Sequence, residues 1–170
     1  MWIKKNINRW SAYGIFYLLL VIIQTSQLLP VTLFGIAPNL MIPVVLSIAI
    51  WEGERVGSIF GLFCGFTWDI LTSKVIGYNA VFLMFTGYIV GTLTKTYLRP
   101  TVLNALILNF SALIVNGILV YVFFYLLWNH AGFTVVMRTI TIPQIIYSMV
   151  YVCPLYFIVK KVSNGLVQIE

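Results

Sequence analysis

Six long apolar stretches, separated by short polar or glycine- and proline-rich segments, make up most of this 170-residue chain. The pattern predicts six helices, over residues 12–29, 38–51, 56–71, 78–94, 102–128 and 140–159. Most of these stretches approach the roughly 20 apolar residues that a helix needs to cross a bilayer. The second is the shortest, and it has Asn39 as its predicted N-cap and Pro43 in its first turns. We therefore expect it to begin in the preceding loop, to kink, or to thin the bilayer locally.

The composition predicts an all-α integral membrane protein with a single domain, residues 1–170. Hydrophobic residues make up 61% of the chain and charged residues 8%, whereas about a quarter of a soluble domain is charged. The net charge of +6 does not indicate a nucleic-acid binder, because the basic residues lie between apolar stretches rather than on one polar face. Cys64 and Cys153 lie within apolar stretches, so we expect small buried side chains rather than a disulfide or metal ligands.

Small residues recur at every fourth position in and just before the third predicted helix. The series consists of Gly53, Gly57, Gly61, Gly65 and Asp69. On a helix with 3.6 residues per turn, these positions form one slowly turning ridge with almost no side chains. Between apolar helices in lipid, small residues let two backbones approach closely. The ridge therefore predicts a helix-packing seam.

The fourth predicted helix carries a matching face of small residues, Ala80, Gly87, Gly91 and Thr94. Two such faces favour a tight contact between the third and fourth helices. A second interpretation stays open, in which the ridge packs against a transmembrane helix of a partner protein. The fifth stretch carries a narrow polar stripe that we expect to face protein and to tie helices together. This stripe consists of Ala105, Asn109, Ala112 and Asn116.

Three of the four acidic residues lie near the two ends of the glycine series. Asp69 has three open roles, since it can reach the membrane interface, pair with Lys74, or cap a neighbouring helix. A compact turn carries both acidic and basic side chains, namely Glu52, Glu54 and Arg55. This turn is either a solvated loop or a docking point for a cytoplasmic partner. The sequence predicts no catalytic, cofactor-binding or metal-binding set. His130 is the only histidine, and the glycine series lacks the Lys-Ser/Thr ending of a phosphate loop.

Basic residues set the predicted orientation, because cytoplasmic loops carry the excess of Lys and Arg. With six spans and the N-terminus inside, the outer side holds only Lys74 and Arg138. The cytoplasmic side then holds the other eight basic residues, Lys4, Lys5, Arg9, Arg55, Lys95, Arg99, Lys160 and Lys161. Both termini are therefore predicted to be cytoplasmic.

Between residue 36 and about residue 95, the order and spacing of several short motifs resemble those of one family. They are Pro38-Asn39-Leu40, the Gly53-Glu54-Arg55 turn, the series Gly57, Gly61 and Gly65, then Asp69, and Gly77-Tyr78-Asn79-Ala80. On these residues the chain resembles the MreD family of rod shape-determining proteins. Many members have Asp where this chain has Asn39, so a carboxylate role at that position does not carry over.

The resemblance implies a non-enzymatic scaffold of the bacterial cell-elongation complex, which acts in peptidoglycan synthesis at the cytoplasmic membrane. The implied partners are the bitopic protein MreC and, with it, the glycosyltransferase RodA, a transpeptidase and the actin-like MreB. The implied fold is similar to the substrate-binding (S) component of energy-coupling-factor vitamin transporters, and such a subunit is the alternative function. Those subunits present an Ala-x-x-x-Ala seam on their first helix, which the stretch from Tyr13 to Leu29 lacks.

Overall fold

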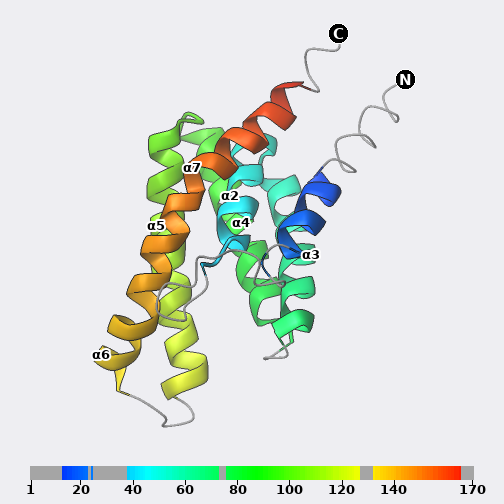
Figure 1. Cartoon of the computed structure of the whole chain (residues 1–170). Helices are drawn as coiled ribbons and strands as arrows, with labels where there is room; N and C mark the ends of the chain where they lie inside the picture. The colour runs from blue at the N-terminus through cyan, green and yellow to red at the C-terminus, as the bar shows by residue number, and fades with distance from the viewer. Residues whose placement is uncertain (1–12, 23, 25–37, 73–75, 127–131, 166–170) are drawn as a thin grey trace.

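The computed structural model describes residues 13–22, 24, 38–72, 76–126 and 132–165, which contain helices and no strand (Figure 1). Because η1 continues α5, and η2 joins α6 to α7, these residues form six helical rods. A first helix covers Tyr13–Ile22. It is followed by α2 (Met41–Glu52), α3 (Glu54–Thr72), α4 (Tyr78–Thr96), α5 (Val102–Val120), η1 (Tyr121–Leu126), α6 (Phe133–Val136), η2 (Met137–Thr141) and α7 (Ile142–Gly165).

The six rods lie where the sequence predicts helices, although their ends differ. α3 begins two residues before residue 56, and the last rod begins at Phe133 rather than at residue 140. The final residues of the predicted first and fifth helices lie outside the described residues. Two of the described rods are long and apolar enough to cross a membrane, Val102–Phe124 and Phe133–Ser163, while Tyr13–Ile22 and Met41–Glu52 are shorter apolar helices. The number of transmembrane spans therefore stays a prediction.

α2 is the central helix of the bundle (Figure 1). Every residue from Met41 to Ile50 is buried, and the helix packs against α3, α4, α5 and α7. A helix that is apolar on all sides is typical of a protein core or of a membrane span, and in this bundle α2 occupies the core. At its start, the side-chain oxygen of Asn39 accepts hydrogen bonds from the N–H groups of Met41 and Ile42, at 3.1 and 3.4 Å. Asn39 thus satisfies two of the N–H groups that a helix start leaves without partners.

Hydroxyl groups tie distant parts of the core together. Polar groups buried among apolar side chains need such partners, because an unpaired donor or acceptor is costly. Tyr17 donates to the Cys64 carbonyl oxygen at 2.9 Å, Tyr156 donates to the Pro100 carbonyl oxygen at 2.8 Å, and the Ser148 hydroxyl accepts from the Asn39 N–H at 2.9 Å. Cys64 is buried and Cys153 is half-buried, and both are free thiols.

Large apolar side chains also cover the outside of the bundle. Ile15, Phe63, Phe85, Ile107 and Phe157 are each more than half exposed. A soluble monomer rarely exposes contiguous apolar patches larger than a few hundred Å², whereas a helix in lipid presents apolar side chains outward. The outer surface of the rods is therefore suited to contact with lipid.

Candidate interaction surfaces

The glycine ridge of α3 lies against the small-residue face of α4, and the two helices run in opposite directions. The register is regular, since each step of four residues forward along α3 is matched by a step of four backward along α4. Gly57 faces Gly87 as well as Ala49 of α2, Gly61 faces the Leu83 carbonyl, Gly65 faces Asn79 and Ala80, and Gly91 faces the Gly53–Glu54 backbone. Of all the described elements, α3 and α4 are in the most extensive contact.

The contact is so close that it excludes even a methyl group. A Cβ atom on Gly87 would lie 2.5 Å from the Gly57 carbonyl oxygen, and one on Gly61 would lie under 3.0 Å from the Leu83 carbonyl oxygen. Both obstacles are backbone atoms of a facing helix, which cannot move aside as a flexible side chain can. Close backbone approach is what small residues permit between apolar helices. The seam is therefore occupied within the chain, and a partner helix has no room on it.

Gly53 differs from the other members of the series. It lies between α2 and α3 and ends α2, with a φ of 88°. A residue with a side chain rarely adopts this conformation, so glycine is required here by the turn. Gly53 precedes α3 rather than lying within it, but its backbone still faces Gly91 at this end of the seam.

Asp69 closes the other end of the seam by capping α4. Its carboxylate is fully buried. It accepts hydrogen bonds from the N–H groups of Gly77, Asn79 and Ala80, at 2.9, 3.1 and 3.2 Å, and from the Asn79 side chain at 2.8 Å. These donors lie at the N-terminal end of α4, where the positive end of the helix dipole favours a carboxylate. Of the three open roles, the structure shows helix capping, and Lys74 lies outside the described residues.

The polar stripe on α5 is buried, but its two Asn side chains act differently. Asn109 donates to the Ala105 carbonyl oxygen of its own helix at 2.8 Å, so this bond does not tie two helices together. The Asn109 side-chain oxygen is buried and has no hydrogen-bond partner among the described residues. Asn116 accepts from the Tyr78 hydroxyl at 3.5 Å, a long bond between α5 and α4. Only Asn116 therefore joins two helices.

One end of the bundle gathers Glu52, Glu54, Arg55, Lys95 and Lys160, and we call it the charged end. Here Glu52 Oε1 accepts from the Tyr13 hydroxyl at 2.6 Å and from the Ser163 hydroxyl at 3.0 Å. These bonds connect the first helix, the end of α2 and the end of α7. Sequence reasoning missed this connection, because Tyr13 and Ser163 lie far from Glu52 in the chain and carry no motif.

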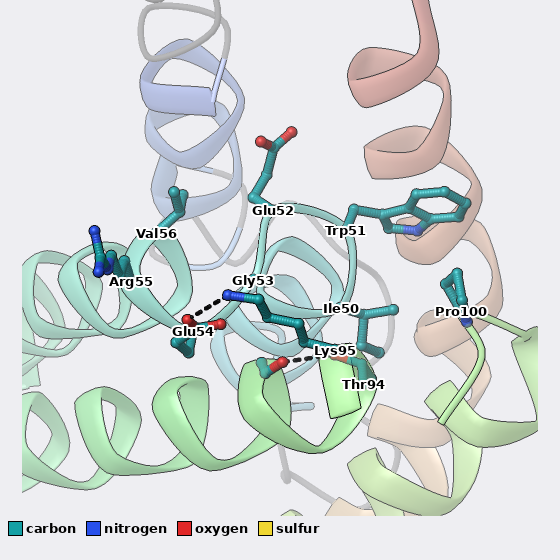
Figure 2. Close-up of a pocket in the computed structure, with 11 residues that line it drawn as sticks. Ile50, Trp51, Glu52, Gly53, Glu54, Arg55, Val56, Thr94, Lys95 and Pro100 are labelled. Carbon is teal, nitrogen blue, oxygen red and sulfur yellow. Dashed lines mark hydrogen bonds and ion pairs between the residues drawn. The ribbon is translucent and has the colours of Figure 1, made fainter. Parts of the chain in front are cut away.

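Glu54 and Lys95 form an ion pair with a distance of 2.8 Å between Oε1 and Nζ (Figure 2). The Glu54 side chain is 20% exposed and that of Lys95 is 68% exposed. Glu54 precedes the apolar part of α3, and the hydrogen bond from Lys95 lowers the pKa of its carboxyl group. Arg55 is exposed and points away from this pair, and it makes no ion pair with any described residue.

An open cavity of about 630 Å³ lies at the charged end between α2, α3 and α4 (Figure 2). Ile50, Val56 and Pro100 contribute apolar surface to it, while the Glu54–Lys95 pair and Thr94 contribute polar groups. Trp51 lines it as well, although its ring extends toward α7. That ring lies 5.8 Å from the Tyr156 ring and 5.7 Å from the Lys160 ammonium, measured from its centroid. The cation over the indole face adds a modest attraction.

The described acidic side chains are engaged in contacts within the bundle. Within the described residues, no group of three or more His, Cys, Asp or Glu side chains is placed to hold a metal ion. The buried carboxylate of Asp69 is used by the α4 N–H groups, and Glu52 and Glu54 are held by hydroxyl and ammonium donors. The charged end presents acidic and basic side chains around an open cavity between α2, α3 and α4.

The family model described as rod shape-determining protein MreD matches residues 4–165 of the 170-residue chain. The resemblance drawn from the motifs between residues 36 and 95 is therefore confirmed over nearly the whole chain. No curated protein and no solved structure matches the chain. The alternative of a vitamin-transporter subunit has no support from these comparisons, and the likeness to that fold stays a prediction.

Proposed function

This chain belongs to the MreD family of rod shape-determining membrane proteins, and on that premise we propose that it is a non-enzymatic scaffold of the bacterial cell-elongation complex. A role in rod shape determination follows from the family itself. The proposal adds that the protein acts by holding other members of the peptidoglycan-synthesising complex together. The observation that carries it is the family match over residues 4–165.

The proposed direct partner is MreC, a bitopic membrane protein, with RodA, a transpeptidase and MreB as associated factors. The charged end supports a docking role for protein segments on the cytoplasmic side. Its open cavity is bordered by the Glu54–Lys95 pair and by Arg55, which is exposed. Charges held on a rigid support fix the register and the choice of a partner more than they add affinity.

In the proposed orientation, all six rods cross the bilayer and the charged end faces the cytoplasm. The described basic residues at this end are Arg55, Lys95, Arg99, Lys160 and Lys161, whereas Arg138 lies near the opposite end. The remaining basic residues that favour this orientation, Lys4, Lys5, Arg9 and Lys74, lie outside the described residues. An excess of Lys and Arg marks the cytoplasmic side of a membrane protein.

Cysteine labelling in intact cells tests the orientation. In a background with Cys64→Ser and Cys153→Ser, Lys74→Cys or Thr134→Cys should react with a membrane-impermeant thiol reagent from outside. Tyr97→Cys should react only after the cells are opened. Labelling of Tyr97→Cys in intact cells, with protection of the other two positions, would reverse the orientation.

Depletion and affinity purification test the function. Depletion in a rod-shaped host should give rounded, swollen cells, and added vitamins should not restore their shape. The tagged wild-type chain, purified in a mild detergent, should retain MreC, while an equally tagged unrelated multi-pass protein should not. Rescue of cell shape by a vitamin, or tight binding of one, would favour the transporter subunit instead.

A further inference from the structure

α4 borders the closed seam on one side and an open apolar groove on the other. α5 follows α4 after the loop 97–101, but the two helices contact each other far less than α3 and α4 do. Two cavities of about 490 and 180 Å³ lie between α4 and the α5–η1 rod. Both are lined by Phe82, Thr86, Ile89 and Val115, so they form one continuous depression, which we call the α4–α5 groove.

The α4 wall of this groove is a seam that follows the helical repeat. Its members come in steps of three and four residues: Tyr78, Val81, Phe82, Phe85, Thr86, Ile89, Val90 and Leu93. At 1.5 Å per residue, the distance from Tyr78 to Leu93 along the helix is about 22 Å. This is most of the roughly 30 Å of hydrocarbon in a bilayer. The groove is therefore about as long as the buried part of one transmembrane helix.

The α5 wall follows the same repeat, with Leu108, Ser111, Ala112, Val115 and Leu119, and η1 adds Phe123 and Phe124. Small residues occur on both walls: Thr86 lines both cavities and Ser111 lines the smaller one. The hydroxyls of these two residues donate to carbonyl oxygens of their own helices, at 2.6 and 2.9 Å. They therefore leave space without presenting an unpaired polar group, which suits the close approach of a third helix.

The lining also limits the chemistry of the occupant. Among the described residues, the lining contains no Asp, Glu, Lys or Arg, so its complement is an uncharged apolar segment. A lipid chain would contact a single strip between the walls, whereas the two walls offer rows of side chains and gaps at the spacing by which helices interdigitate. A helix bound to a single convex helix face would be covered on one side only, whereas a helix bound in this groove would contact both walls.

We propose that the α4–α5 groove binds the transmembrane helix of a single-pass partner, with a small residue of that helix facing Thr86 and Ser111. The proposal rests on the proposed function, because it assigns a binding surface to the bitopic partner. It also accounts for the weak contact between α4 and α5, since the space between them is kept for a third helix.

Matched tryptophan substitutions test the groove. Val115 lines it and is 48% exposed, whereas Ile118 lies outside its lining on the same helix and is 45% exposed. Val115→Trp should lower the recovery of co-expressed MreC by about tenfold, equivalent to about 1.4 kcal/mol, and Ile118→Trp should leave it unchanged. Both purified variants should melt like the wild type, because neither ring enters the closed core. Equal recovery of MreC by the two variants would overturn the proposal.

Photocrosslinking identifies the occupant directly. A benzophenone amino acid at position 115, but not at position 118, should give an adduct whose mass spectrum contains the apolar transmembrane peptide of MreC. An adduct with a phospholipid, or with a second copy of this chain, would overturn the proposal. If the wild type retains MreC and position 115 gives no such adduct, the groove assignment fails while the proposed function stands. If the wild type retains no MreC, the proposed function fails first.

Discussion

α4 meets α3 and α5, its two neighbours in the chain, in opposite ways. Both connections are short, yet α3 lies in backbone contact with α4 while α5 is held apart by a groove. Toward α3, α4 presents Ala80, Gly87 and Gly91; toward α5 it presents Phe82, Phe85 and Ile89. The size of the side chains on each face thus decides whether a helix contact closes inside the chain or stays open for another molecule.

The two faces also differ in how their ends are fixed. On the closed face, Asp69 caps α4 at one end and the Glu54–Lys95 pair joins the helices at the other. On the open face, the one described hydrogen bond between α4 and the α5 rod is the long contact from Tyr78 to Asn116. The stronger polar contacts of α4 are therefore made on the face that already packs closely against α3. This comparison predicts that α3 and α4 behave as one rigid unit.

The largest expected effect comes from filling the closed face. Gly61→Leu or Gly65→Leu places a branched side chain where even a Cβ atom would meet the α4 backbone. We expect a loss of about 3 kcal/mol in the free energy of unfolding, the upper end for overpacked contacts, because backbone is harder to displace than side chain. Thermal unfolding of the purified protein, without any partner, measures it.

Gly14 provides a matched control for these substitutions. It lies in the first helix, and a Cβ atom there would meet no atom of the described residues within 4 Å. Gly14→Ala should therefore unfold at or slightly above the wild-type temperature, since Ala favours the helix. Wild-type melting of both Leu variants would mean that α3 and α4 are not in contact.

The sequence predicted the closed face because glycine spacing identifies a seam on both helices independently. It left the role of Asp69 open, since the sequence does not show that one carboxylate accepts from the N–H groups of Gly77, Asn79 and Ala80 at the start of α4. The central place of α2 was not predictable either. A segment that is apolar on every side has no preferred face, so its pattern cannot show which neighbours cover it.

The groove and the last rod were missed for related reasons. Large apolar residues such as Phe85 and Ile89 are typical both of lipid-facing and of partner-facing surfaces, and their pattern does not separate the two. The sequence placed the start of the last helix at residue 140 and treated Pro143 as an interruption of that helix. In the structure, η2 carries the helix into α7 ahead of this proline, and the wider π-helical turn cannot be read from composition.

A smaller loss is expected when the cap of α4 is weakened. Asp69→Asn keeps the shape of the side chain but replaces one acceptor oxygen by a donor that faces N–H groups. Losing hydrogen bonds to a charged, buried acceptor should lower the free energy of unfolding by about 1 to 3 kcal/mol. Asn79→Ala removes only the side-chain donor to Asp69 and should cost less. A wild-type melting temperature for Asp69→Asn would show that its charge is not used in the fold.

The ion pair at the charged end should contribute less, and its contribution should depend on pH and salt. Because Lys95 lowers the pKa of Glu54 from its ordinary value of 4.5, the stabilisation is present above that value and is lost as the pH falls through the lower folded-state pKa. Glu54→Gln should therefore lower the melting temperature slightly at neutral pH, and the difference should vanish in acid or at high salt. A difference that persists under both conditions would indicate a role other than pairing.

The smallest expected effect on stability comes from filling the open face, and two adjacent residues of α4 allow the comparison. Gly87 faces α3, where a Cβ atom would lie 2.5 Å from the Gly57 carbonyl oxygen, whereas Thr86 lines the α4–α5 groove. Gly87→Leu should destabilise the protein as strongly as Gly61→Leu does, for the same reason.

Thr86→Leu removes a hydroxyl that bonds only within its own helix, and the new leucine side chain extends into open space. The free energy of unfolding should therefore change by less than about 0.5 kcal/mol. Its effect should appear instead in the recovery of MreC, because the added methyl groups occupy the place kept for the partner helix. Comparable destabilisation by both substitutions would mean that the groove closes on itself in the membrane. In that case α4 would have two internal faces, and the partner would have to bind elsewhere.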